Sequence, residues 1–436
     1  MSFPTLKSLA IQNISHPVVI KGFITKWSLL NWNLEDWAIK FGDRVLPFRV
    51  GSNDEASVKG EPIWERNCST EYMTFKEFMN WESGPDGLIK KKWMYFDYKY
   101  MHEWFEDDPD FLKAIDWGCL GFHGRNGQES TLWVGSHGAH TPCHADTYGF
   151  NLVAQLYGRK RWLLFPPDSK QLLHRASRIP YEESSIYVQG CVGGGEGGAR
   201  GIVLSPGEVL VVPRRWWHRV DTDGGISISV NTWVPSEQDN AARLEESLVR
   251  FLFASTLESL PLEWQKSFLN PNEDDLPSTS LADNLIMVRQ TVEACTTQFQ
   301  QTELPLSPDT GIQVTTSGKS CFLPNRSPPM KRMKPTVKVD CLQKADESGK
   351  PCVRVVPLVG SDGWHSWDQN DTKSPARINP QHENSEILQR ILNAFCHPEV
   401  ISLVSQKMLA NSLKSHCTKN APPQETGHVS TSSMLN

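Results

Sequence analysis

The chain has 436 residues, 39% of them hydrophobic, which is enough for one large globular unit followed by less ordered sequence. A formal net charge of -6 argues against general nucleic-acid affinity. Ten cysteines without a Cys-x-x-Cys pair argue against zinc fingers and disulfide-stapled folds, and we find no long apolar run or signal-type leader. We therefore expect a cytoplasmic protein without membrane contact.

The first hundred residues predict an α/β segment. Pro17–Phe23 is typical of a β strand, Thr74–Trp81 has helical spacing, and Trp93–Tyr98 is extended. The tryptophans between residues 27 and 37 are interpreted as core. We expect residues 1–98 to buttress the domain that follows them.

A His-x-Asp pair follows this segment and is the first candidate for metal binding. On an extended strand, side chains two residues apart project to the same face, so His144 and Asp146 can reach one point. Such a pair also occurs by chance in many chains, and its context decides the interpretation.

A third ligand is expected from His218. The apolar run Val209–Pro213 predicts a buried strand, opened by a turn at Pro206–Gly207, and His218 follows it with Trp216 and Trp217 as an aromatic wall. Two imidazoles and one carboxylate are the facial triad of non-haem Fe(II) oxygenases, so this set predicts an iron site.

Two further strands place polar side chains toward the same interior. Lys160 shares one strand face with Trp162, which predicts that its ammonium enters an apolar chamber. The alternative interpretation is that Lys160 belongs to a solvated basic turn after Gly158. Between Ile226 and Trp233, polar and apolar residues alternate as in a half-buried strand, which turns Asn231 and Trp233 inward. A hydrogen-bonded structural asparagine is the alternative for Asn231.

The remaining third of the chain changes character. Helical spacing over Ala241–Leu252 predicts a helix that packs on the barrel or pairs with a second subunit, and residues 261–300 are expected to add a helical extension, with one helix over Leu281–Phe299. Pro- and Ser-rich sequence predicts a disordered linker over residues 301–380. Residues 381–436 carry amphipathic helices and a tail, which pack on the domain or bind a partner.

Two local features have competing interpretations. The glycine-rich stretch Gly190–Gly201 is a lid or, as we prefer, a flexible surface loop. The basic cluster Lys331–Lys334 is a solvated charge run by default and a nuclear signal as the alternative.

Four ordered motifs carry a family resemblance: Thr141–Asp146, Asn151–Pro167, Gly207–His218 and Gly225–Trp233. Together they resemble a JmjC domain, close to the asparagine-hydroxylase-like subgroup. The resemblance is densest over residues 132–234, is weaker over residues 17–257, and leaves the last third unmatched.

This resemblance implies a mainly β fold with α: a double-stranded β-helix, the cupin or jelly-roll JmjC barrel, with flanking helices and a largely disordered C-terminal third. The JmjC domain would span residues 99–260, with its barrel core over 131–234. The implied reaction couples substrate oxidation by O2 to decarboxylation of 2-oxoglutarate at Fe(II).

The resemblance also implies roles for individual residues. His144, Asp146 and His218 match the iron ligands. The residues that match positions contacting 2-oxoglutarate or lining its chamber are Lys160, Thr141, Asn151, Asn231, Trp233 and, by a looser alignment, Tyr95. The stretch between Asp146 and Asn151 has one residue more than in the subgroup, so the resemblance does not carry over the substrate.

The overall layout resembles JmjC proteins that associate with small heat-shock proteins, which implies such a partner, cytoplasmic residence and a stress-response role. We therefore keep two hypotheses: a protein hydroxylase, and a catalytically silent scaffold that binds a small heat-shock protein. RNA-modifying and demethylating JmjC enzymes are further alternatives. The intact triad together with Lys160 favours chemistry, because a scaffold gains nothing from buried charged groups.

Overall fold

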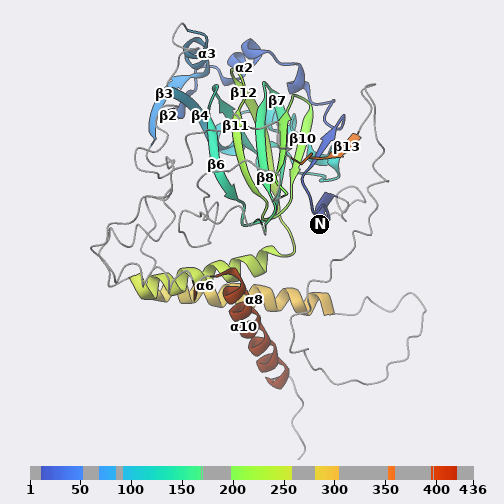
Figure 1. Ribbon diagram of the computed structural model, residues 1–436, viewed down its shortest axis with the longest axis vertical. Helices are drawn as coiled ribbons and strands as arrows, with labels where there is room; N and C mark the ends of the chain where they lie inside the picture. The colour runs from blue at the N-terminus through green and yellow to red at the C-terminus, as the bar shows by residue number, and fades with distance from the viewer. Residues whose placement is uncertain are drawn as a thin grey trace, which may run out of the picture.

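The computed structural model describes residues 11–52, 68–84, 92–167, 169, 198–257, 280–303, 352–358, 394–395 and 397–419. Two antiparallel sheets face each other at its centre, and a group of helices lies at one end (Figure 1). A mainly β, cupin-like fold with helices is confirmed. The glycine-rich segment, except for residues 198–201, the Lys331–Lys334 cluster and most of the first C-terminal amphipathic pattern lie outside the described residues.

The large sheet has the strand order β13-β1-β10-β7-β12-β5-β4-β2-β3 among the described residues. Its strands are β1 (Val18–Lys21), β2 (Val45–Ser52), β3 (Ser69–Thr74), β4 (Lys92–Tyr100), β5 (Thr131–Gly135), β7 (Phe150–Tyr157), β10 (Glu208–Val212), β12 (Ser227–Val234) and β13 (Cys352–Val355). The small sheet has the order β6-β11-β8-β9, from β6 (His140–Ala145), β8 (Lys160–Phe165), β9 (Arg200–Leu204) and β11 (Trp217–Thr222). Several neighbouring strands, such as β1 and β10, β6 and β11, and β7 and β12, are far apart in the chain, so long-range pairing holds the two sheets together.

Short helices cover the outer face of the large sheet. They are α2 (Leu34–Phe41), α3 (Phe75–Ser83), α4 (Met101–Trp104) and α5 (Pro109–Lys113), with 3-10 turns at Ser28–Asn31, Trp117–Leu120 and Gly127–Glu129. The sequence starts the two longest with capping boxes, in which Asn33 pairs with Asp36 and Thr74 pairs with Glu77. Their aromatic side chains then stack, as Phe41 does on Phe75 at 4.7 Å between ring centroids.

This layer changes one expectation about β12. The alternation of Ser227–Val234 predicts a strand with one wet face, but nearly every residue of β12 is buried. Ile228 and Val230 pack into the core under the N-terminal helices, while Asn231 faces the space between the sheets. The half-buried prediction is wrong because a distant part of the chain covers the outer face.

A second correction concerns the expected linker. Residues 352–358 lie inside the range 301–380, yet they are ordered around β13 (Cys352–Val355), which pairs antiparallel with β1. Val356 of this segment is fully buried in the core between the sheets. The linker prediction is therefore wrong for this segment, where Val353 and Val356 supply apolar surface to a free sheet edge.

Three long helices follow the barrel, α6 (Asp239–Leu257), α8 (Leu281–Glu303) and α10 (Pro398–Lys419). The first two lie side by side below the sheets and α10 crosses them (Figure 1). Leu244 and Leu248 of α6 pack on Val288 and Cys295 of α8. Within the described part of the chain, no helix combines the length and apolar character required to cross a bilayer.

Candidate metal centre

His144, Asp146 and His218 come together at the mouth of the space between the sheets. His144 lies near the end of β6 and Asp146 directly follows that strand. His218 lies on β11, which pairs with β6 so that His218 stands opposite His144. Sheet register therefore brings together two residues that are 74 positions apart in the sequence.

The three side chains point their donor atoms at one another. The Nε2 atoms of His144 and His218 lie 3.7 and 4.0 Å from the two carboxylate oxygens of Asp146, and one donor atom from each residue lies within 4.8 Å of the others. The imidazole rings are 4.2 Å apart between centroids. Among the described residues this is the one cluster with the composition of a metal site.

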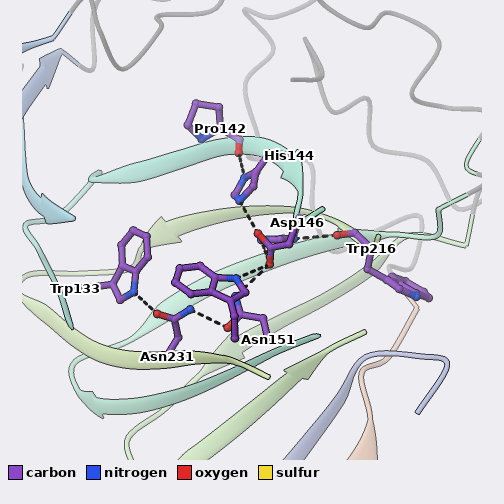
Figure 2. Close-up of polar contacts among 9 residues, drawn as sticks. Trp133, Pro142, His144, Asp146, Asn151, Trp216 and Asn231 are labelled. Atoms are coloured by element: carbon purple, nitrogen blue, oxygen red, sulfur yellow. Dashed lines mark hydrogen bonds and ion pairs between the residues drawn. The ribbon is translucent and has the colours of Figure 1, made fainter. Parts of the chain in front are cut away.

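Backbone carbonyls fix the tautomers of both imidazoles. Nδ1 of His144 lies 2.8 Å from the carbonyl oxygen of Pro142 (Figure 2). Nδ1 of His218 lies 2.9 Å from the carbonyl oxygen of Trp216. Because a carbonyl only accepts, each Nδ1 carries the proton and each Nε2 keeps its lone pair for a ligand. Burial, and then the neighbouring His218, lower the pKa of His144, which keeps it neutral.

Asp146 is oriented by a chain of donors. The Trp233 indole donates to its Oδ2 at 3.1 Å, and Asn151 Nδ2 donates to the same oxygen at 3.3 Å. Asn231 donates to Asn151 Oδ1 at 2.8 Å, and Trp133 donates to Asn231 Oδ1 at 2.7 Å (Figure 2). These hydrogen bonds hold the Asp146 carboxylate with Oδ1 toward His144 and Oδ2 toward His218. The donor set fits a divalent iron of the facial-triad type.

Lys160 lies in the wall of the same cavity and is 2% exposed. Its ammonium donates to Tyr95 Oη at 3.0 Å and to Ser229 Oγ at 2.8 Å, and it forms no ion pair with a described residue. Burial lowers the pKa of Lys160 to about 7, against the effect of the Asp97 charge. A buried cation held by neutral hydroxyls lacks the anion that a carboxylate ligand would supply.

All nine residues that the sequence indicates line this cavity, which encloses about 390 Å³ of space, part of it open to solvent. Thr141 of β6 is buried there with His144, and Tyr95 of β4 lies near Lys160. The large sheet contributes Asn151, Asn231 and Trp233, and the small sheet contributes the imidazoles and Lys160. Lys160 is therefore buried in the cavity wall and does not belong to a solvated turn.

Some wall residues are missing from the sequence-based set. Trp133 and Tyr98 line the cavity and contact each other edge to face at 4.7 Å, and Val153 and Val220 complete the apolar wall. Tyr98 has a left-handed φ of 52° beside a β-bulge, which redirects its side chain. Trp133 pairs in register with Ser229. The pairing of β5 with β12 is therefore the signal from which Trp133 could have been identified.

The aromatic wall beside His218 differs from the expected one. The ring that stacks on His218 is Trp162, at 5.7 Å between centroids, while Trp216 contributes its carbonyl and donates its indole N–H to the carbonyl oxygen of Ser15 at 3.1 Å. The indole N–H of Trp162 is buried and meets no acceptor among the described residues.

Comparisons with known proteins agree with this geometry. The family model of the cupin-like domain matches residues 7–240. HSPB1-associated protein 1 from Homo sapiens is 38% identical over 301 residues, covering 65% of this chain and 60% of that protein, and its homolog from Danio rerio is 37% identical over 303 residues, covering 65% and 66%. The chain thus spans under two thirds of the length of these relatives.

A relative with a different name is also similar to the chain, at lower identity. Lysine-specific demethylase 8 from Xenopus tropicalis is 28% identical over 239 residues, or 50% of this chain and 47% of that protein. The part of the chain that matches the family model contains every strand of the two sheets except β13, and every cavity residue named above. The chain belongs to the cupin-like JmjC family.

Proposed function

We propose that the protein is an Fe(II)- and 2-oxoglutarate-dependent oxygenase that hydroxylates a protein side chain. The observation that supports this best is the convergence of two carbonyl-fixed imidazoles and one carboxylate in a cavity that also holds a buried ammonium. Iron bound there supplies the activation of O2, coupled to oxidative decarboxylation of 2-oxoglutarate.

The residues around the cavity have separable roles in this proposal. His144, Asp146 and His218 hold the metal, with Asn151, Asn231 and Trp233 orienting the carboxylate. Lys160, with Thr141 and Tyr95, binds the far carboxylate of 2-oxoglutarate, because a single buried cation at the end of an apolar chamber matches a dicarboxylate held at its other end.

A turnover assay tests the proposal directly. Purified protein with added Fe(II), 2-oxoglutarate and O2 is expected to form succinate without added substrate, and His144→Ala is expected to form none. His140→Ala is a matched control, because His140 lies on the same strand but does not line the cavity. If the unaltered protein forms no succinate, or if His144→Ala forms as much as the unaltered protein, the proposal that the protein is an oxygenase is rejected.

A second candidate function is binding to a small heat-shock protein. It is supported by the name that the relatives carry, HSPB1-associated protein 1, and by apolar residues exposed on α8 and α10, among them Leu285 and Leu403. Binding is expected to survive Asp146→Ala and to disappear when the chain ends before Asn384. The opposite pattern contradicts the scaffold.

The same helices are our proposed site of homodimerisation, which sedimentation of the full chain measures. We place the protein in the cytoplasm, with the nucleus as the alternative, and connect it to the stress response through the chaperone. Among the possible reactions, hydroxylation is preferred to demethylation, because no chromatin-reading module is recognised in the sequence. The net charge of -6 disfavours an RNA substrate.

A further inference from the structure

The first turns of α6 contact two loops that adjoin segments with metal-site residues. One loop, residues 147–149, directly follows Asp146, and the other, residues 213–216, directly precedes β11 with His218. Both loops belong to the barrel, whereas α6 is the first element after it (Figure 1). The helix therefore bridges the two segments from which the triad is assembled.

The loop after Asp146 is held by three contacts. The Tyr148 hydroxyl donates to Glu246, and the guanidinium of Arg243 lies 4.9 Å above the Tyr148 ring. The Gly149 N–H donates to Asp239 Oδ1 at 2.9 Å. At a φ of +61°, a Cβ on Gly149 would lie 2.4 Å from the carbonyl oxygen of Val234, so backbone sterics also fix this loop path.

The loop before His218 is held by two arginines. Arg214 donates to Gln238 Oε1 at 2.6 Å, directly before the helix, and Arg215 donates to Glu245 Oε2 at 2.8 Å. Arg215 has a left-handed φ of 61°, a conformation that a non-glycine residue rarely adopts without support. Its ion pair with the helix provides that support.

Helix α8 in turn holds the start of α6. Gln298 donates to the carbonyl oxygen of Glu237 at 2.8 Å and accepts from Asn240 Nδ2 at 2.8 Å. Ser247 and Thr291 share a hydrogen bond of 3.0 Å further along the two helices. A displacement of α8 therefore acts on the same turns of α6 that grip the two loops.

We propose that α6 sets the separation between Asp146 and His218, and that α8 acts on metal affinity through α6. Tyr148, Arg215 and Gln298 are then positioning residues for the metal centre. This inference rests on the proposed metal site. It gives the helical end of the molecule a functional connection to the cavity, although no described residue of α6 or α8 lines that cavity.

The probe is Co(II) alone, titrated into the full chain and followed by visible absorbance and chelator competition. We expect Tyr148→Phe and Arg215→Gln each to weaken binding by about three- to tenfold, below the roughly 10- to 100-fold cost of losing a direct partner of a metal ligand. Their combination is expected to multiply these losses, because the two residues hold different loops. Gln298→Ala is expected to weaken binding about threefold.

Stability measurements separate positioning from a general loss of structure. Tyr148→Phe and Arg215→Gln each remove one of the hydrogen bonds described above and Gln298→Ala removes two, all of them part-buried or exposed, so the metal-free protein is expected to keep its unfolding midpoint. Arg44→Gln, which loses the exposed ion pair with Asp107 in the N-terminal layer, is the matched control and is expected to bind Co(II) as before.

Two negative results have different meanings. If the unaltered protein binds one equivalent of Co(II) and all three variants retain its affinity and absorbance spectrum, the positioning proposal is overturned. If the unaltered protein binds no Co(II), the proposed metal site itself fails.

A double variant tests whether the Tyr148 hydroxyl acts through the carboxylate of Glu246. Tyr148→Phe combined with Glu246→Ala is expected to bind Co(II) no more weakly than the weaker of the two single variants, because both changes remove the hydrogen bond between Tyr148 and Glu246. The hydrogen bond from Arg250 to Glu246 is lost equally in the single Glu246 variant and in the double variant. Losses that multiply in the double variant would contradict this route from α6 to the loop after Asp146.

Discussion

At the scale of single residues, the energetically costly group in this molecule is the ammonium of Lys160. It lies in an apolar wall, and its partners Tyr95 and Ser229 are neutral. The rings of Tyr95 and Trp133 lie 5.1 and 5.6 Å from Nζ and give weaker support. A charge kept in such surroundings indicates a site prepared for an anion.

The lowered pKa of Lys160 gives a prediction about pH and stability. Its pKa is about 7 in the folded protein, against 10.5 for a lysine in water, so between these values the unfolded chain binds a proton that the folded chain has released. The free energy of unfolding should therefore rise with pH across this window. Chemical denaturation at pH 7 and 10 measures this rise, and Lys160→Met should reduce it.

The same group predicts proton uptake on ligand binding. At pH 8.5 the Lys160 side chain is mostly a neutral amine, and a bound carboxylate restores its charge, so 2-oxoglutarate binding should take up about 1 proton. Calorimetry in two buffers of different ionisation enthalpy, under anaerobic conditions, measures this number. Binding without proton uptake by the unaltered protein would show that Lys160 does not face the dicarboxylate.

At the scale of elements, the tight turn between β7 and β8 places Lys160 at the start of its strand. Gly158 has a φ of +62°, and a Cβ there would lie 2.1 Å from the carbonyl oxygen of Ile226. We expect Gly158→Ala to lower the free energy of unfolding by about 3 kcal/mol or more, because strain and a backbone clash add.

Gly225→Ala is the control for that prediction. Gly225 has a similar φ of +77°, but a Cβ would meet nothing within 4 Å, so only conformational strain applies. The expected cost is about 1 kcal/mol. Urea denaturation of both variants measures the difference, and equal costs would show that the close approach at Gly158 relaxes freely.

Local sequence patterns were sufficient for the elements that carry the site. The i, i+2 spacing of His144 and Asp146 and the alternation in β12 placed these side chains correctly, because a strand has a strict period of two. Tyr98 was not predictable in this way, since its direction depends on a bulge that shifts the register of β4 against β5. The expected linker missed β13 because a four-residue strand has too little periodicity to detect.

At the scale of the whole molecule, the cavity exists because two sheets built from distant segments close on each other. The segment 352–358 contacts both sheets. Its strand β13 pairs with β1 of the large sheet, and its residue Leu358 forms a β-bridge with Arg200 of β9 in the small sheet. Arg200 also donates to the carbonyl oxygen of Val356 at 2.6 Å. A segment far from the barrel in sequence thus spans the edges of both sheets.

This arrangement predicts that Val356 stabilises the barrel itself. Val356 is fully buried in the same cluster as Trp162, which stacks on His218, so Val356→Asp places an unpaired carboxylate in that core. The expected loss in the free energy of unfolding is about 3 kcal/mol or more. Val355→Asp is the matched control, because Val355 directly precedes Val356 at the end of β13 and is 47% exposed. Thermal unfolding of the two variants decides whether β13 is part of the barrel's cooperative unit, and equal unfolding midpoints would show that the barrel is stable without it.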